Sequence, residues 1–143
     1  MKKIIIIISA FVVIVGAVIG IGVAKKSDTK SSNTIKIGGV FDTSGNISAY
    51  GQAEQKGANF AVKRINDDGG VKVDGKNYKF KMVNKDSKSD NTEAASVTTN
   101  LINNNQVNAI VGPVVTSAVQ AAIPAATKGK TPMISPTAGA DNI

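Results

Sequence analysis

Two clusters of hydroxyl-bearing residues follow short apolar runs in the last third of the chain. The run at 109–111 leads into Thr116 and Ser117, and the run at 133–134 leads into Thr137. Short apolar runs bounded by Gly and Pro are typical of buried parallel strands. Beyond the carboxyl ends of such strands, loops expose backbone N–H groups and the next helix presents its positive N-terminus. Thr116 and Thr137 are therefore placed where an anionic group would be held.

The amino-acid composition argues against catalysis. The 143 residues include no Cys and no His, which removes thiol nucleophiles, thiolate metal sites, disulfides and the usual general base. A small hydrolase would need a Ser or Asp nucleophile, and no base accompanies any candidate. Asp42, just past the first predicted strand, is interpreted as a turn residue. We expect no enzymatic activity, no cofactor and no metal site.

The positive charge of the chain is spread unevenly. The formal net charge is +7, and residues 1–33 alone contain five Lys and one Asp. The remaining lysines are dispersed and only 4% of the residues are aromatic, so the pattern does not indicate a nucleic-acid surface. Gly38 and Gly39 lack the third spaced glycine of a dinucleotide-binding loop, which argues against a nucleotide site.

The first 24 residues are typical of a targeting or anchoring segment. Met1, Lys2 and Lys3 precede an apolar run at 4–24. A cleaved signal peptide usually has an apolar region of about 7–15 residues, whereas about 20 residues suffice to span a bilayer. Both a cleaved signal peptide and an uncleaved membrane anchor helix remain open. In either case we expect an exported protein, held on the outer face of the cell membrane or secreted.

The remaining chain is expected to form one small domain. Residues 25–33 are rich in Ser, Thr, Lys and Asp and are predicted to be a polar linker too hydrophilic to pack. From residue 34 to residue 143, predicted strands alternate with predicted helices, which indicates an α/β fold with a parallel sheet and flanking helices. The predicted strands cover 35–41, 78–83, 109–111 and 132–134, and the helices cover 48–65, 91–102 and a segment beginning near 116.

Local signals in the first half set the expected boundaries. Ser48 is a plausible N-cap, and Gly69 follows the helix as a stop signal. Asp74 and Gly75 are typical of a tight hairpin leading into a strand at 78–83 that has one wet face and is expected at an edge of the sheet. The small and apolar residues that recur at helical spacing are Ala53, Gly57, Phe60, Ala61 and Ile65.

The second half carries its own capping signals. Residues 85–90 are predicted to form a charged loop, and Asp90 with Glu93 has the spacing of a capping box. Thr116 or Ser117 can cap the next helix. Pro124 conflicts with an uninterrupted helix because it removes a backbone donor and clashes one turn back, so a kink or a broken start is expected there.

Taken together, these segments resemble the leucine/isoleucine/valine-binding proteins of bacterial ABC importers, which have the type I periplasmic binding fold. The resemblance covers the chain from about residue 34 onward and is specific as an ensemble. It is carried by the sequences IKIG at 35–38, TSG at 43–45, SAYG at 48–51, GA at 57–58, IN at 65–66, GGV at 69–71, IVGP at 110–113, TS at 116–117 and PMISPTA at 132–138.

The resemblance implies a ligand and a set of contacts. In this family an amino acid lies between two lobes, and the first lobe holds its charged groups. By this resemblance the hydroxyl and N–H of Thr116, beside Ser117, would take the carboxylate, and Val114 would line the apolar pocket. The Thr137 carbonyl would meet the ammonium group, and Tyr50 would lie at the rim of the cleft.

The end of the chain departs from the family pattern. Ala138 and Gly139 complete the expected ligand-binding segment, but at Gly139 the branched-chain binders typically carry a Thr that contacts both charged groups of the ligand. Loss of that hydroxyl removes a charge-assisted hydrogen bond worth about 1.5–3 kcal/mol, so another small carboxylate or an amide becomes a plausible ligand. The family's cysteine pair is also absent.

The resemblance also implies a partner and an incomplete binding cleft. Members of the family are more than twice as long as this chain, so we expect residues 34–143 to be the first part of lobe one, truncated, and to bind weakly alone. The expected function is the solute-binding component of an amino-acid importer, whose partner is a membrane permease, with weak or no binding by this chain alone. The alternatives are the ligand-binding sensor domain of a membrane receptor and, less favoured, a small Ser or Asp hydrolase.

Overall fold

The computed structural model describes residues 33–141. The segment expected to be a signal peptide or anchor, at 1–24, lies outside these residues, as does most of the predicted linker. Among residues 33–141, no helix is both long and apolar enough to cross a membrane.

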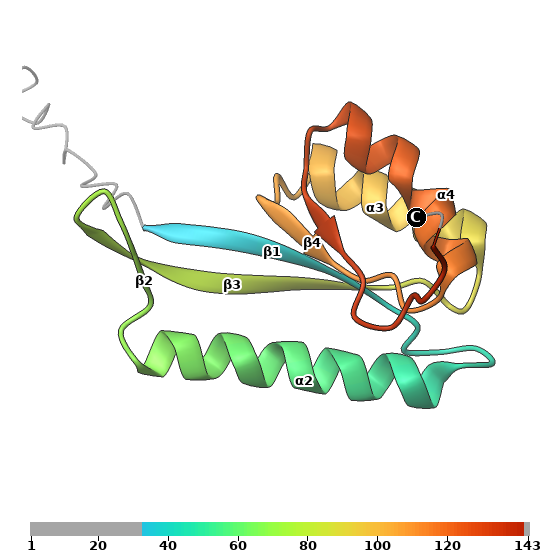
Figure 1. Ribbon diagram of the computed structural model, residues 1–143, viewed down its shortest axis with the longest axis horizontal. Coiled ribbons are helices and arrows are strands. Elements are labelled where there is room, and N and C mark those ends of the chain that lie inside the picture. Colours follow the sequence, from blue (N-terminus) through green and yellow to red (C-terminus); the bar gives the residue numbers. More distant parts are fainter. Residues whose placement is uncertain (1–32, 142–143) are drawn as a thin grey trace, which may run out of the picture. The chain divides into compact units, whose positions relative to one another are not determined.

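A five-stranded sheet forms the centre of the described domain (Figure 1). The strand order is β2-β3-β1-β4-β5, and the pairs β1–β3, β1–β4 and β4–β5 are parallel, whereas β2 runs antiparallel to β3. The α/β class and the mostly parallel sheet are therefore confirmed. The strands are β1 (Thr34–Phe41), β2 (Val71–Val73), β3 (Lys76–Asp86), β4 (Ala109–Val111) and β5 (Met133–Ile134).

Three helices cover the two faces of this sheet. Figure 1 shows α2 (Ser48–Asp67) along one face, and α3 (Asn91–Asn103) and α4 (Thr116–Lys128) side by side on the other. Asn84 of β3 donates from Nδ2 to Asn59 Oδ1 of α2 at 3.1 Å. On the opposite face, a Cβ atom placed on Gly38 would lie 3.0 Å from Leu101 Cδ1 of α3.

The apolar core lies between the sheet and the pair α3 and α4. Burying these aliphatic side chains stabilises this half of the domain, because removal of apolar area from water is the main favourable term in folding. Gly38 fits here because it lets β1 approach α3 closely. The buried cluster contains Val40, Ala94, Val97, Leu101, Val107, Ile110 and Ala118.

Helix α2 packs through a different face from the one its apolar spacing indicates. Phe60 is 63% exposed, and Gly51 is the one residue of α2 that is buried. The N-cap is Ile47, which makes no side-chain capping bond, so the assignment of Ser48 as the cap was wrong. The face that α2 turns toward the rest of the domain is set instead by a close contact at Gly51, where a Cβ would lie 2.2 Å from the Asp42 carbonyl oxygen.

The hairpin between β2 and β3 is confirmed, but β3 is longer than predicted. Asp74 and Gly75 both have positive φ, as a tight turn requires. The strand continues through Lys85 and Asp86, which were expected in a loop, because the whole of β1 pairs with β3 and the last pair joins Phe41 to Asp86. The edge position expected for this strand was wrong, because the short β2 lies outside it and β3 is second from the edge of the sheet.

Helices α3 and α4 test the capping predictions with opposite results. Asp90 is the N-cap of α3, and its Oδ1 accepts from Glu93 N at 2.7 Å, as predicted. The N-cap of α4 is Val115, so neither hydroxyl proposed as its cap has that role. Helix α4 also runs unbroken through Pro124, so the broken start expected there was wrong, whereas the expected kink stays a prediction. Strand β5 lacks Pro132.

Candidate ligand-binding site

The candidate site lies where the sheet topology changes direction. From β1 the chain passes through α2 to β3 on one side of β1, and later to β4 on the other side. The loops after β1 and β4 therefore diverge and leave a crevice, which is where open α/β sheets bind ligands. Gly112, with φ of +97°, follows β4 here, and a Cβ on it would lie 2.1 Å from the Val40 carbonyl oxygen.

A pocket of about 470 Å³ opens at this crevice, within the range usual for small-molecule sites. The lining comes from the loops that follow β1, β4 and β5, three neighbouring strands, and from the first turns of α2 and α4. Tyr50 is 69% exposed and lies at the rim, whereas Val114 is 3% exposed and supplies an apolar wall. The lining residues are Ile47, Tyr50, Val114, Val115, Thr116, Ser117 and Thr137.

The N-terminus of α4 faces this pocket through its first two residues, Thr116 and Ser117. No side chain caps α4. The first N–H groups of a helix have no partner within the helix, and the helix dipole adds positive potential there. An acceptor such as a carboxylate in the pocket would therefore meet uncapped N–H donors beside the Thr116 hydroxyl.

Hydrogen bonds hold two of the lining hydroxyls in place. Ser117 Oγ donates to Asn91 Oδ1 of α3 at 3.1 Å, so this hydroxyl is already engaged outside the pocket. Thr137 Oγ1 lies 2.5 Å from the Val114 carbonyl oxygen and 2.5 Å from Glu54 Oε1. Thr137 thereby links the loops after β4 and β5 to α2.

The last two predicted site residues do not line the pocket. Ala138 N donates to Ser135 Oγ at 3.1 Å, so its N–H is used within the loop. Gly139 follows it, and a Cβ there would meet nothing within 4 Å. The sequence alone did not show that the Ser135 hydroxyl folds this segment back on itself, because that bond depends on the path of the loop.

The carboxylate of Asp86, which the sequence alone did not single out, orders the loop after β1. Asp86 Oδ1 accepts from Thr43 N and Ser44 N, and its Oδ2 accepts from Ser44 Oγ at 2.7 Å. Partial burial raises the pKa of Asp86, but the hydrogen bonds from Ser44, Lys88 and Thr43 outweigh it and hold the pKa below its ordinary value. This loop leads directly into the Ile47 and Tyr50 side of the pocket.

Asp42 also differs from its interpretation as a turn residue. Its side chain is 1% exposed, and Oδ1 accepts from the Ser87 hydroxyl at 3.0 Å. Among the described residues no group of three or more His, Cys, Asp and Glu could hold a metal ion. The buried carboxylate therefore belongs to the packing at the base of the loop after β1.

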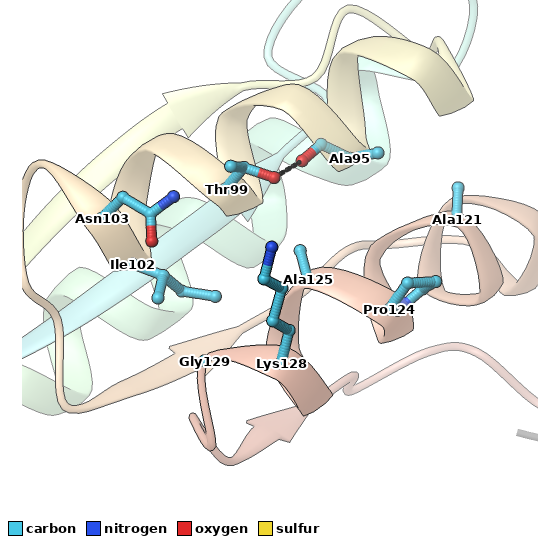
Figure 2. Close-up of a pocket in the computed structure, with 9 residues that line it drawn as sticks. All are labelled: Ala95, Thr99, Ile102, Asn103, Ala121, Pro124, Ala125, Lys128 and Gly129. Atoms are coloured by element: carbon cyan, nitrogen blue, oxygen red, sulfur yellow. Dashed lines mark hydrogen bonds between the residues drawn. The ribbon is translucent and has the colours of Figure 1, made fainter.

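A second hollow lies on the outer surface, between α3 and α4 (Figure 2). Its volume is about 430 Å³, and Ala121, Pro124 and Ala125 of α4 face Ile102 of α3 across it. The hydroxyl of Thr99, a polar group of α3 that lines the hollow, donates back to the Ala95 carbonyl oxygen. No lining group is a free acid and Lys128 is the only cation, so the hollow offers few polar anchors.

The sheet order and the position of the pocket are both typical of an α/β binding protein, and a comparison with known protein families agrees with this. A model of the periplasmic binding protein family matches residues 34–142. The chain belongs to the periplasmic binding protein family. The match covers nearly all the described residues, and the parallel sheet with helices on both faces is the type I periplasmic binding fold seen in the solved relatives.

Several solved structures resemble this member of the family. The branched-chain amino acid transporter substrate-binding protein LivJ of Streptococcus pneumoniae, solved with isoleucine, is 52% identical, with a TM-score of 0.71 over 76% of this chain. The leucine-binding protein LivK of Thermotoga maritima is 26% identical, with a TM-score of 0.63 over 74%. A solute-binding protein of Rhodopseudomonas palustris, solved with 3,4-dihydroxybenzoic acid, is 30% identical, with a TM-score of 0.65 over 75%.

The chain spans less than a third of the length of these relatives. The aligned part corresponds to 30% of the Streptococcus pneumoniae protein and to 28% of each of the other two. The part of the periplasmic binding fold described by residues 33–141 is thus one sheet with its helices and the pocket at its edge.

Proposed function

We propose that this chain contributes to the binding of a branched-chain amino acid by the extracytoplasmic component of an ABC importer, without performing chemistry. The carrying observation is the pocket itself, which brings five of the seven predicted contact residues, from three separate loops, to one place. The 52% identity to a branched-chain amino acid binding protein solved with isoleucine supports the ligand class. The proposed partner is a membrane permease, and the proposed location is outside the cytoplasm.

The proposed ligand pose follows from the charges of the pocket. The carboxylate of the amino acid would accept from the uncapped N–H groups at the start of α4 and from the Thr116 hydroxyl. The aliphatic side chain would pack against Val114 and the ring of Tyr50. The Thr137 carbonyl oxygen would accept from the ammonium group. Ala138 and Gly139 would shape the loop around it.

A titration of the isotopically labelled chain with isoleucine, followed by NMR, tests this pose even at low affinity. We expect amide resonances of Val115, Thr116 and Tyr50 to shift, and Thr116→Ala to reduce the affinity by about tenfold, because a hydrogen bond to a charged group is worth roughly 1.5–3 kcal/mol. Thr127→Ala, at the other end of α4, is the matched control and should bind like the wild type. Equal binding by Thr116→Ala would remove the carboxylate from this position.

A further inference from the structure

A carboxylate lies one hydrogen bond behind the wall of the pocket. Glu54 of α2 does not line the pocket, whereas Thr137 does. Glu54 Oε1 is 2.5 Å from the Thr137 hydroxyl. The same hydroxyl is 2.5 Å from the Val114 carbonyl oxygen. A hydroxyl has one proton to donate, so the two acceptors share it. The position of Thr137 therefore depends on Glu54.

The second oxygen of this carboxylate has no counter-charge among residues 33–141. Glu54 Oε2 is buried without a hydrogen-bond partner, and neither ion pair of the described chain, Lys63 with Asp67 or Lys88 with Glu93, includes it. Glu54 as a whole is half-buried and its bond with Thr137 is exposed, but the buried Oε2 is screened less than a fully exposed carboxylate oxygen.

The two sides of the pocket consequently differ in electrostatic potential. The uncapped N-terminus of α4, at Thr116, is positive. The Thr137 side is negative because of Glu54 behind it. A zwitterion with its carboxylate at Thr116 and its ammonium group toward Thr137 matches both sides, whereas a monoanion matches only one.

We infer that Glu54 is the residue that makes this pocket select an α-amino acid over a carboxylic acid of the same shape without an amino group. It acts as a positioning residue, through Thr137 and through its charge, and it does not touch the ligand. This inference rests on the proposed function. It also addresses a real difference between the relatives, since one was solved with isoleucine and another with 3,4-dihydroxybenzoic acid, which has no amino group.

The test compares Glu54→Gln with the wild type by NMR titration of the full 143-residue chain with isoleucine and with 3-methylpentanoate, which is isoleucine without its amino group. Gln keeps the size of Glu and an acceptor for Thr137, but removes the charge. We expect the isoleucine affinity to fall about tenfold, because the attraction between the Glu54 charge and the ammonium group is lost while the contacts to the carboxylate remain. The 3-methylpentanoate affinity should stay the same or rise.

Asp74→Asn is the matched control, because it removes one exposed carboxylate in the turn between β2 and β3, at the opposite end of β3 from the loop that leads to the pocket. It should leave the ratio of the two affinities unchanged. A Glu54→Gln variant that keeps this ratio, whether both affinities fall equally or neither changes, would overturn the inference while leaving the proposed function in place. A wild-type chain that binds neither compound would overturn the proposed function itself.

Discussion

At the scale of single residues, Asp86 illustrates how one side chain prepares a distant contact. Its carboxylate collects donors from Thr43, Ser44 and Lys88, and thereby fixes the loop that carries the chain from β1 into α2. Tyr50, at the start of α2, is placed on the pocket rim as a consequence. A carboxylate that accepts several hydrogen bonds favours its charged form, which is the reason for its lowered pKa.

This lowered pKa predicts a pH dependence of stability. Because the pKa of Asp86 is lower in the folded chain than in the unfolded chain, its contribution is fully present above the ordinary value of about 3.9 and is lost as the pH falls through the folded value. Urea denaturation of the wild type and Asp86→Asn should show a difference in the free energy of unfolding that shrinks as the pH is lowered from about 6 to about 3. A difference that stays constant over this range would contradict the assignment.

Two glycines of α2 offer a matched pair of substitutions. In Gly51→Ala the new methyl group would lie 2.2 Å from the Asp42 carbonyl oxygen, so the helix must move, and we expect a loss of about 1–3 kcal/mol in the free energy of unfolding. In Gly57→Ala the methyl group meets nothing within 4 Å, and the higher helix propensity of Ala should add about 0.5–1 kcal/mol. Thermal or urea denaturation measures both. Equal effects would mean that Asp42 and Gly51 are not in contact.

At the scale of elements, α4 combines a role at the pocket with an internal strain. Its N-terminus points at the site, while Pro124 lies two turns further on in an unbroken helix. Proline in a helix interior lacks the N–H that would bond one turn back and crowds the preceding carbonyl. The buried side chains of Ala118, Val119 and Ala122 keep the helix on the sheet despite this cost.

Replacing this proline should stabilise the chain. Proline is about 3 kcal/mol less favourable than Ala in a helix interior, and its restriction of the unfolded chain returns about 1 kcal/mol. We therefore expect Pro124→Ala to raise the free energy of unfolding by about 1–2 kcal/mol, measured with urea. Thr127→Ala, also exposed in α4, should change it by less than about 0.5 kcal/mol. A destabilised Pro124→Ala variant would show that the packing of the proline ring in the hollow between α3 and α4 outweighs its backbone cost.

At the scale of the whole molecule, the described domain supplies one wall of a pocket. Tyr50 is 69% exposed and Thr137 is also exposed, so two of the residues that would touch the ligand face solvent. Small-molecule sites usually bury 70–90% of their ligand. We expect the chain to bind isoleucine with a dissociation constant on the order of millimolar, measured by NMR or calorimetry. A micromolar value would show that the described wall suffices for tight binding.

The hydrophobic pattern and the turn residues determined the class of the domain. Parallel strands buried on both faces require short apolar runs, and the Asp74 and Gly75 turn requires positive φ, so both features can be predicted from local sequence. The ends of the strands also determined that Thr116 and Thr137 would lie beside the same pocket, because parallel strands end at the same edge of the sheet.

Only the tertiary structure decided which contacts these elements make. The apolar spacing of α2 suggests a buried Phe60, yet the close approach of Gly51 to Asp42 rotates that side chain into solvent. The roles of Glu54 and Asp86 depend on partners 83 and 42 residues away in the sequence. Local sequence carries no signal for such pairs, because the distance between the partners is set by the strand order and the loop paths and not by the residues beside them.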